Sequence, residues 1–399
     1  MNLVKSFVRS PSAGGVLLLI AAALGVWIAN SPESHQYFEF LEMPIGPLSV
    51  ELWINDVLMA IFFLGVGMEV KHEMIEGELN TGAKRFLPSI GAFFGVCGPA
   101  IIYSLFNYHS AEYLRGWAIP TATDIAFAIG IISIIGPRVP VALKVFLTTL
   151  AVVDDLIAVI IIAAFYTANL QFIYMGIAVL IILALTILNK KDVIHPLPYL
   201  VLGIGLWYCI FQSGLHATLS GVILAMTIPY KAVRNGVVKY PMNAWNKAIA
   251  NWITFVVIPL FGFANAGVSF GDFQASDLLH PVVLGVALGL FLGKQIGVFG
   301  TMYVLVKTKI VPMPTHATWA HVYGIALCCG IGFTMSLFVN LLALPAGHAQ
   351  EMAKVGIFIG SILSGVCGFI VLRYFTPDVS SLEKKDSVVA IEHVDHVVE

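Results

Sequence analysis

The sequence predicts an all-α membrane protein of about twelve transmembrane helices. Apolar residue types make up 59% of the 399 residues and charged types only 11%, and the mean hydropathy is +0.91. An ordinary soluble domain carries about 25% charged residues. The composition therefore excludes a soluble globular protein and indicates that lipid surrounds most of the chain.

Successive apolar stretches of about 20 residues, the length that a transmembrane helix needs, follow one another from Ser12 to Phe375. Short polar loops separate them, and one stretch is short. The predicted spans are 12–29, 53–70, 87–107, 116–136, 141–167, 171–189, 196–212, 215–229, 248–270, 281–306, 319–343 and 352–374. They form one membrane domain over 1–375, followed at 376–399 by a polar, charged tail that we expect to be disordered.

The distribution of basic residues predicts the orientation, because cytoplasmic loops retain Lys and Arg. With the N-terminus inside, 18 of the 21 basic residues fall on the cytoplasmic side, only Arg115 and Lys354 fall outside, and Lys294 lies within a span. An even number of spans with both termini in the cytoplasm follows. The first apolar run is read as a retained anchor, since the charge pattern continues unbroken if it is kept.

The loop FEFLEMPIGPLSVELW, residues 38–53, alternates apolar and polar residues around a Pro and Gly turn. This pattern favours an external β-hairpin. An irregular outer loop is the alternative.

Few ionisable residues lie within the spans away from their cytoplasmic ends and loops, and those considered are Asp56, Asp124, Asp154, Asp155 and Lys294. A charged side chain at a helix centre costs about 2.5–3.5 kcal/mol on insertion scales, whereas a Leu or Ile returns only about 0.3–0.6. Intramembrane charges therefore indicate a functional site by default. The alternative is a purely structural ion pair that holds two helices together, such as Asp154 with Lys294.

The adjacent carboxylates of Asp154 and Asp155 point about 100° apart on a helix, so they cannot aim at the same spot. Their roles are expected to differ. One would face a water-filled cavity as the exposed ion ligand, while the other would turn toward Lys294 or Asp124. Such a pair can exchange protons for a cation near neutral pH.

Two spans are interrupted in corresponding positions. The fourth reads GWAIPTATDIAFAIG (116–130), where Pro120 cannot donate in a helix interior and Thr121, Thr123 and Asp124 are good N-cap types. The eleventh reads ALCCGIGFTMSLF (326–338). Antiparallel interrupted spans indicate a transporter built from inverted repeats, here about 87–167 and 281–374.

If both helices break near the midplane, two positive N-terminal ends and two negative C-terminal ends meet there. Asp124 is placed to neutralise the positive ends, and Lys294 the negative ones. Close helix packing is the alternative role for Gly330 and Gly332, and it is the preferred role for the stripe of Gly285, Gly289, Gly293 and Gly297. We expect that stripe to bring another helix close to Lys294.

The cysteines and the net charge predict no cofactor and no nucleic-acid partner. All five cysteines lie in apolar runs, and neither CxxC spacing nor a companion His at metal-ligand distance is present. The formal charge of −2 comes with no basic stripe.

The chain resembles the bacterial NhaA-type Na+/H+ antiporters over nearly its whole length, from Pro11 to Phe375. The family is itself a known example of broken helices in a transporter. The motifs that carry the resemblance are FFLGVGMEVK (62–71), PTATDIAFAIG (120–130), LAVVDDLIAVIIIAAFYT (150–167), SGLHATLSG (213–221), PLFGFANAGV (259–268), LGLFLGK (288–294) and GIGFTMSLF (330–338).

The resemblance implies an inner-membrane antiporter that exports Na+ or Li+ in exchange for protons and serves pH and sodium homeostasis. The family's ion and proton site falls on Asp154 and Asp155, its broken-helix residues on Thr123 and Asp124, and its intramembrane lysine on Lys294. The helix crossing would comprise Thr121, Gly330, Gly332, Phe333 and Thr334.

The family's pH-sensing acids fall on Glu69 and Glu73, but the chain has His72 where the family commonly has Arg or Lys. His72 titrates in the relevant range if unperturbed, although an ordinary solvated helix end explains this cluster equally well. His216 falls on a pH-response position, and a merely exposed loop histidine is the alternative. Family members dimerise through such an external hairpin, which implies a homodimer through 38–53.

The expected mechanism is alternating access in which Na+, held by oxygens of Asp154, Asp155 and Thr123, competes with protons. Because two carboxylates are discharged for one monovalent cation, the exchange would move net charge. The main alternative is a Na+-coupled symporter of an organic solute. An intramembrane aspartyl protease is disfavoured because neighbours on one helix cannot share a proton, and a passive channel would not need Lys294.

Overall fold

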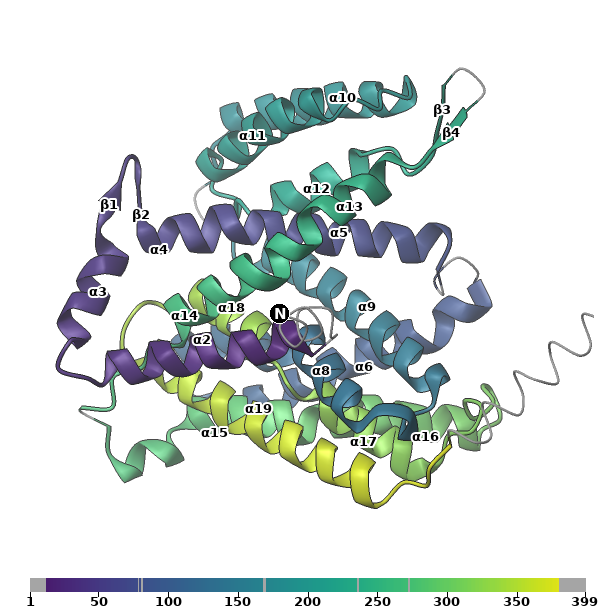
Figure 1. Cartoon of the computed structure of the whole chain (residues 1–399). Coiled ribbons are helices and arrows are strands. Elements are labelled where there is room, and N and C mark those ends of the chain that lie inside the picture. Colours follow the sequence, from purple (N-terminus) through teal and green to yellow (C-terminus); the bar gives the residue numbers. More distant parts are fainter. Residues whose placement is uncertain are drawn as a thin grey trace, which may run out of the picture.

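The computed structural model describes residues 12–379 except 78, 80–81, 168–169, 235–236 and 272. Most of the tail expected at 376–399 therefore lies outside the described residues. The described chain is almost entirely helical (Figure 1). In the first half the helices are α2 (Ala13–Ala29), α3 (Ser34–Glu42), α4 (Val50–Leu52), η1 (Trp53–Leu58), α5 (Met59–Ile75), α6 (Gly82–Asn107), α7 (Ala111–Leu114), η2 (Arg115–Thr121), α8 (Ile125–Ile135), η3 (Gly136–Arg138), α9 (Val141–Phe165) and α10 (Phe172–Lys190).

The second half continues in the same way, and several helices begin with proline, which is tolerated in the first turn because its missing N–H is an orphan there anyway. Its helices are α11 (Pro196–Gln212), α12 (Leu219–Thr227), α13 (Pro241–Trp252), η4 (Ile253–Val257), α14 (Ile258–Ala266), η5 (Ala275–Leu279), α15 (Pro281–Leu288), η6 (Gly289–Gly293), η7 (Gln295–Phe299), α16 (Gly300–Lys307), α17 (Trp319–Cys329), α18 (Phe333–Ala343) and α19 (His348–Tyr374).

Among the described residues, eight helical segments are long and apolar enough to cross a membrane, or up to ten if each of two sharply bent pairs counts as one span. The bent pairs are α2 with α3, at 113°, and α17 with α18, at 40°. A multi-pass membrane protein is therefore supported, while the predicted count of twelve stays a prediction. Of the eighth predicted span, 215–229, only the nine residues of α12 are helical, because the chain forms turns before Leu219.

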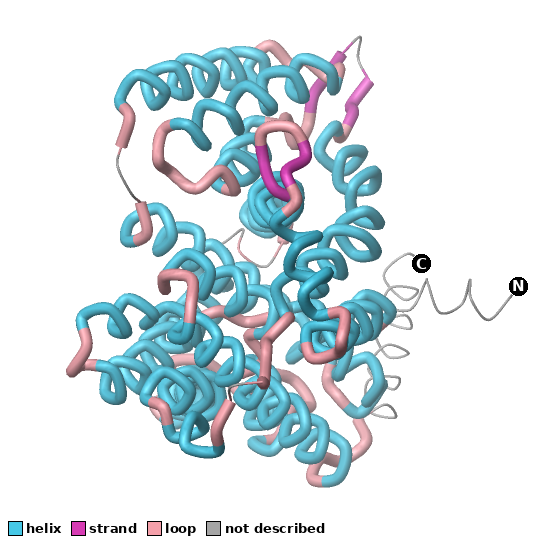
Figure 2. Tube along the Cα trace, turned by 90° about the vertical axis from the view of Figure 1, so that its left-hand side faces the viewer, coloured by secondary structure: helices cyan, strands magenta, loops and turns pink. Residues whose placement is uncertain are grey.

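Two short antiparallel hairpins lie at the surface (Figure 2). In the first, β1 (Pro44–Ile45) pairs with β2 (Leu48–Ser49). It is narrower than the hairpin expected over 38–53, because residues up to Glu42 belong to α3 and a new helix starts at Val50. Apolar residues at every second position include pairs four residues apart, which also lie on one face of a helix. In α3 this buried face consists of Tyr37 and Leu41. The second hairpin, β3 (Ala232–Arg234) with β4 (Val237–Lys239), was not predicted.

The glycine stripe of the tenth predicted span packs directly on α6. An added Cβ at Gly293 would lie 2.5 Å from the Cα of Pro99, and one at Gly289 would lie 2.9 Å from the side chain of Pro120. Side chains cannot be accommodated at these distances, so the stripe allows the backbones to approach closely. This approach positions Lys294, the next residue after Gly293, deep inside the bundle, where its side chain is fully buried.

Candidate functional site

The fourth predicted span is interrupted next to its proline. Helix η2 ends at Thr121, residues 122–124 are not helical, and α8 begins at Ile125. Thr123 and Asp124 are buried in this gap. Proline favours the interruption because it cannot donate a backbone hydrogen bond and restricts the residue before it.

A second gap lies opposite the first. Helix α17 ends at Cys329, and α18 begins at Phe333. The two gaps touch through their backbones, since the N–H of Asp124 donates to the carbonyl of Ile331 at 2.6 Å. An added Cβ at Gly330 would lie 2.5 Å from the carbonyl oxygen of Leu290, so this residue both breaks the helix and permits close packing.

Asp124 caps two helices at once. Its Oδ1 accepts from the backbone N–H of Phe127, in the first turn of α8, at 3.2 Å. Its Oδ2 accepts from the backbone N–H of Thr334 at 3.0 Å and from the Thr334 hydroxyl at 2.5 Å, at the start of α18. A carboxylate in this position stabilises the partial positive charge of both helix N-termini.

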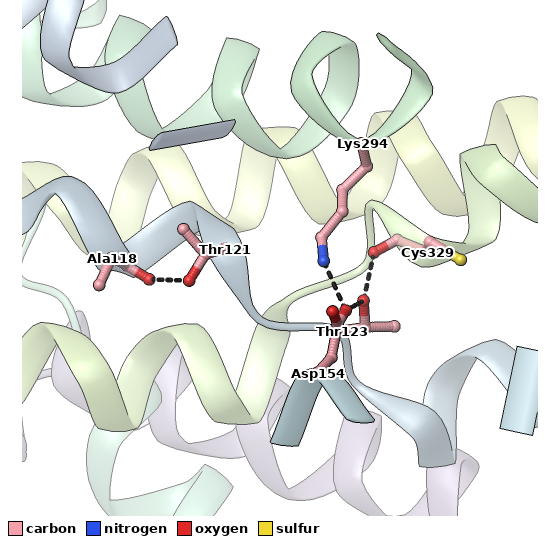
Figure 3. A network of polar contacts seen from close by, with 6 residues as sticks. All are labelled: Ala118, Thr121, Thr123, Asp154, Lys294 and Cys329. Atoms are coloured by element: carbon pink, nitrogen blue, oxygen red, sulfur yellow. Dashed lines mark hydrogen bonds and ion pairs between the residues drawn. The ribbon is translucent and has the colours of Figure 1, made fainter. Parts of the chain in front are cut away.

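Asp154 is held between two other elements (Figure 3). The Lys294 ammonium donates to its Oδ2 at 2.6 Å, and both side chains are completely buried. The Thr123 hydroxyl lies 2.8 Å from the same oxygen and 2.9 Å from the carbonyl oxygen of Cys329, either of which can accept its proton. Lys294 thus lies against a carboxylate, the ion pair that the sequence offered as an alternative, and its compensation of the negative helix ends stays a prediction.

Asp155 points to a different environment from that of its neighbour. It lines a cavity of about 180 Å³ together with Glu69, Thr123, Asp124 and Thr334. Asn246 and Thr254 add polar atoms to the wall. A water molecule occupies about 30 Å³ in the liquid, so the cavity has room for a small hydrated ion.

Each carboxylate keeps a ligand atom available. Among the described residues, the Oδ1 atoms of Asp154 and Asp155 are buried and have no hydrogen-bond partner. Buried polar atoms without partners are rare in proteins and call for an explanation. A cation or a proton bound at these oxygens would supply it.

The charges of the four fully buried ionisable groups of the site do not balance when all four are ionised. Asp124, Asp154 and Asp155 carry three negative charges against the single positive charge of Lys294. The two helix N-termini that Asp124 caps contribute roughly half a positive charge each. About one negative charge is left uncompensated in a buried region, which favours uptake of one monovalent cation or of protons.

The remaining residues predicted for the helix crossing lie around this centre without contacting Asp154. The Thr121 hydroxyl donates to the carbonyl of Ala118, 2.8 Å away, within its own helical turn and away from the carboxylates (Figure 3). The ring of Phe333 packs edge-on against Phe127 at 5.4 Å. Gly332 donates its N–H to the Ser361 hydroxyl at 3.3 Å.

The residues predicted to sense pH are found in two separate places. Glu69 lines the cavity beside Asp155, and His72 and Glu73 follow it at the end of α5. His216 lies elsewhere, with its Nε2 2.7 Å from the carbonyl oxygen of Tyr166. Tyr166 follows Asp155 by 11 residues at the end of α9, which is roughly 16 Å along the helix.

A hydrogen-bonded chain links His72 to an acid. The Tyr230 hydroxyl donates to Glu76 Oε2 at 2.5 Å and lies 3.0 Å from His72 Nδ1. With the hydroxyl proton directed to Glu76, the chain is complete in the His72 tautomer whose Nδ1–H donates to the Tyr230 oxygen. Burial, together with this bond to Glu76, raises the pKa of Tyr230 to about 12, so the phenol stays protonated.

Several partners in the site were missed by the sequence analysis. The carbonyls of Cys329 and Ile331 belong to the backbone, which every residue has, so no residue type could reveal them. Asn246 and Tyr230 lie on elements distant in sequence from the acids that they approach. The one indication available for the carbonyls was the helix break itself, which frees such groups.

Comparisons with known proteins agree on one family. The model of the family described as Na+/H+ antiporter 1 matches residues 5–372. The Na+/H+ antiporter NhaA 1 of Brucella anthropi is 48% identical over 94% of this chain and 96% of its own, and the Na+/H+ antiporter NhaA of Nitrobacter hamburgensis is 50% identical over 93% and 91%. The NhaA of Brucella melitensis is 48% identical over 96% of this chain, which spans 52% of that protein's length.

A similar arrangement of helices is found in a more distant protein. The solved structure of the sodium proton antiporter MjNhaP1 from Methanocaldococcus jannaschii at pH 8 matches with a TM-score of 0.52 at 17% sequence identity. The match covers 93% of this chain and 96% of that chain. At this level of identity the likeness concerns the fold.

Proposed function

Because the chain belongs to the Na+/H+ antiporter 1 family, we propose that it exchanges Na+ or Li+ for protons across the bacterial inner membrane, with both termini in the cytoplasm. We further propose twelve spans in two inverted repeats, with the breaks at 122–124 and 330–332 crossing near the midplane. The single observation that supports this function most is the pair of neighbouring buried carboxylates, one paired with Lys294 and one lining a cavity.

In this mechanism Na+ binds to oxygens of Asp155, Asp154 and Thr123, and protons replace it. The partner of the pair that faces the ion pathway is Asp155, since it lines the cavity through which ions would arrive. Asp154 offers its unpartnered Oδ1 to the ion while its Oδ2 lies 2.6 Å from the Lys294 ammonium, and release of Oδ2 would add a second ligand atom. Protons and Na+ exclude each other because both need the same oxygens, and this competition couples their fluxes.

The size of the cavity favours an ion over an organic solute. Sites for small organic ligands usually occupy about 300–1,000 Å³, whereas this cavity measures about 180 Å³. A Na+-coupled symporter would also need recognition groups for its solute. The antiporter is therefore the better supported of the two functions.

The direct test is Na+-induced proton movement in everted membrane vesicles of a host strain without its own Na+/H+ antiporters. We expect addition of Na+ or Li+ to dissipate an imposed pH gradient, while choline has no effect. No response to either cation, with the protein present in the membrane, would contradict the proposed function.

We expect the exchange to be electrogenic, because two carboxylates are discharged for each monovalent cation. In proteoliposomes loaded with Na+, an interior-negative potential set by K+ and valinomycin should then accelerate Na+ efflux. The potential contributes about 2.3 kcal/mol per net charge per 100 mV. Efflux that is independent of the potential would indicate equal exchange.

The chain of His72, Tyr230 and Glu76 is proposed to contribute to the pH response, together with Glu69 and Glu73. We expect Tyr230→Phe to shift the midpoint of the pH activation profile by about half a unit, because the phenol that is hydrogen-bonded to both His72 and Glu76 is lost and such a bond is worth about 0.7 kcal/mol. The measurement is the initial rate of Na+-induced proton movement from pH 6.5 to 9.

Tyr240→Phe is the matched control, because the Tyr240 ring packs edge-on against Tyr230 at 6.2 Å and the side chain is 43% exposed. Its profile should stay that of the wild type. The phenol of Tyr230 stays protonated from pH 6.5 to 9, because its pKa is raised to about 12. A profile for Tyr230→Phe that overlays the wild type would exclude the chain from the pH response.

The external hairpin of β1 and β2 is proposed as the contact between two copies of the chain. Its apolar side chains support such a contact, since Ile45 is 54% exposed and Met43, just before the hairpin, 48%. Deleting residues 44–49 and measuring the mass of the detergent complex by light scattering tests this assembly.

A further inference from the structure

A large apolar groove is separate from the carboxylate cavity, with which it shares no lining residue. It encloses about 860 Å³ between α2, α8 and α19. Both α2 and α19 lie in the foreground of Figure 1. Apart from Asn30 and Ser361, its lining consists of apolar side chains and one glycine. A groove of this size can hold a ligand as large as a drug molecule.

The groove has a buried floor and an exposed rim. At the floor, Ile331 is 3% exposed, Phe333 7% and Phe127 9%. At the rim, Trp27 is 68% exposed and Ile362 63%. The groove is therefore continuous with the outer surface of α2 and α19, which faces the hydrocarbon of the membrane.

Its length corresponds to one leaflet of a bilayer. From Leu19 to Trp27 the groove follows α2 for roughly 12 Å, and from Phe358 to Phe369 it follows α19 for roughly 16 Å. The hydrocarbon core of a bilayer is about 30 Å thick, so one leaflet contributes about 15 Å. Trp27 and Asn30 mark one end, and tryptophan is enriched at the level of the lipid headgroups.

An apolar groove at this depth must be filled from the bilayer. Water does not enter apolar cavities readily, and an empty groove would deprive its walls of dispersion contacts. Lipid tails are as apolar as leucine and already cover the adjoining surface. We propose that the acyl chain of a bilayer phospholipid binds in this groove, with its headgroup beside Trp27 and Asn30.

The bound chain would rest against the back of the helix crossing. The side chain of Ile331 forms part of the groove floor, while its carbonyl accepts the hydrogen bond from Asp124 at 2.6 Å. Ser361, also in the lining, accepts from the N–H of Gly332 at 3.3 Å. The lipid is thus separated from the ion site by one layer of residues, and its binding does not depend on the proposed transport activity.

The test is photolabelling of the purified full-length chain in phosphatidylcholine bilayers that contain a phosphatidylcholine with a diazirine in its acyl chain. Labelled positions are mapped by mass spectrometry of peptides. We expect adducts at the floor residues Phe333 and Phe358 as well as at the rim residue Ile362. Adducts at the rim alone would overturn the proposal.

Ala23→Trp fills the groove, and we expect it to lower floor labelling about tenfold, which corresponds to about 1.4 kcal/mol of lost binding. Leu24→Trp is the matched control, because Leu24 is the next residue on α2, is 45% exposed and does not line the groove. It should leave floor labelling unchanged.

Gly365→Leu provides a second variant if Ala23→Trp does not fold. An added Cβ there would lie 3.2 Å from Ile131 Cδ1 and 3.6 Å from Ile331 Cδ1, so the new side chain enters the groove. Equal floor labelling in the wild type and both filled variants would show that the adducts come from bulk lipid. Floor labelling that appears only after deletion of residues 2–10 would show that the chain's own N-terminal segment fills the groove; either result would refute the proposal.

Discussion

Asp155→Asn is expected to abolish Na+-induced proton movement, with a rate at least about 100-fold below that of the wild type, equivalent to about 2.7 kcal/mol. The amide has the size of the carboxylate but carries neither the charge that attracts Na+ nor an exchangeable acidic proton. Asp155 lines the cavity and keeps Oδ1 without a partner among the described residues, so this oxygen is available to an ion or a proton and the substitution removes its charge. The measurement is proton movement in everted vesicles at matched amounts of inserted protein.

Asp56→Asn is the matched control for that experiment. Asp56 also lies in a predicted span, but it does not line the carboxylate cavity. Its exchange rate should stay within about twofold of the wild type, because the amide keeps the size of the side chain and the carboxylates of the cavity remain in place. If Asp155→Asn retained normal exchange and Asp154→Asn did not, the ion would bind at the Lys294 side of the pair instead.

Much of this site could be predicted from the sequence, because its residue types are costly in a membrane. Asp124, Asp154 and Lys294 are noticeable in apolar runs for that reason, and the helix geometry alone required Asp154 and Asp155 to face different surroundings. The proline at position 120 and the two glycines of the eleventh span also marked where helical hydrogen bonding is interrupted.

The partners could not be predicted, because they depend on tertiary packing. Nothing local decides that Lys294 pairs with Asp154, 140 residues away, rather than with Asp124 or Asp155. The extent of α12 was also out of reach, since its apolar run from 215 continues through a turn that hydropathy does not detect. The lipid groove is equally hidden, because its lining residues look like ordinary membrane-facing side chains until three helices are placed around them.

Lys294→Gln is expected to destabilise the protein more than any other single change considered above. The substitution leaves Asp154 buried without its counter-charge, and removal of one partner from a buried ion pair costs about 3–5 kcal/mol. The side chains of both residues are completely buried, so solvent cannot replace the lost interaction. The measurement is the midpoint of thermal unfolding in detergent, followed by intrinsic fluorescence.

Two further variants distinguish the stability lost by breaking the ion pair from the stability lost by removing any lysine. Lys354→Gln removes a lysine that donates to the carbonyl of Gly267 at 3.1 Å, and it should cost about 1.5–3 kcal/mol, the value of a hydrogen bond with a charged donor and less than the loss expected for Lys294→Gln. The double variant Asp154→Asn/Lys294→Gln removes both charges together, so it should recover most of the stability lost in Lys294→Gln. The stability changes of substitutions at residues in direct contact do not simply add, so this recovery measures the coupling energy between the two side chains. A double variant as unstable as the sum of the single ones would mean that Lys294 stabilises the bundle through packing alone, and that Asp154 does not depend on its charge.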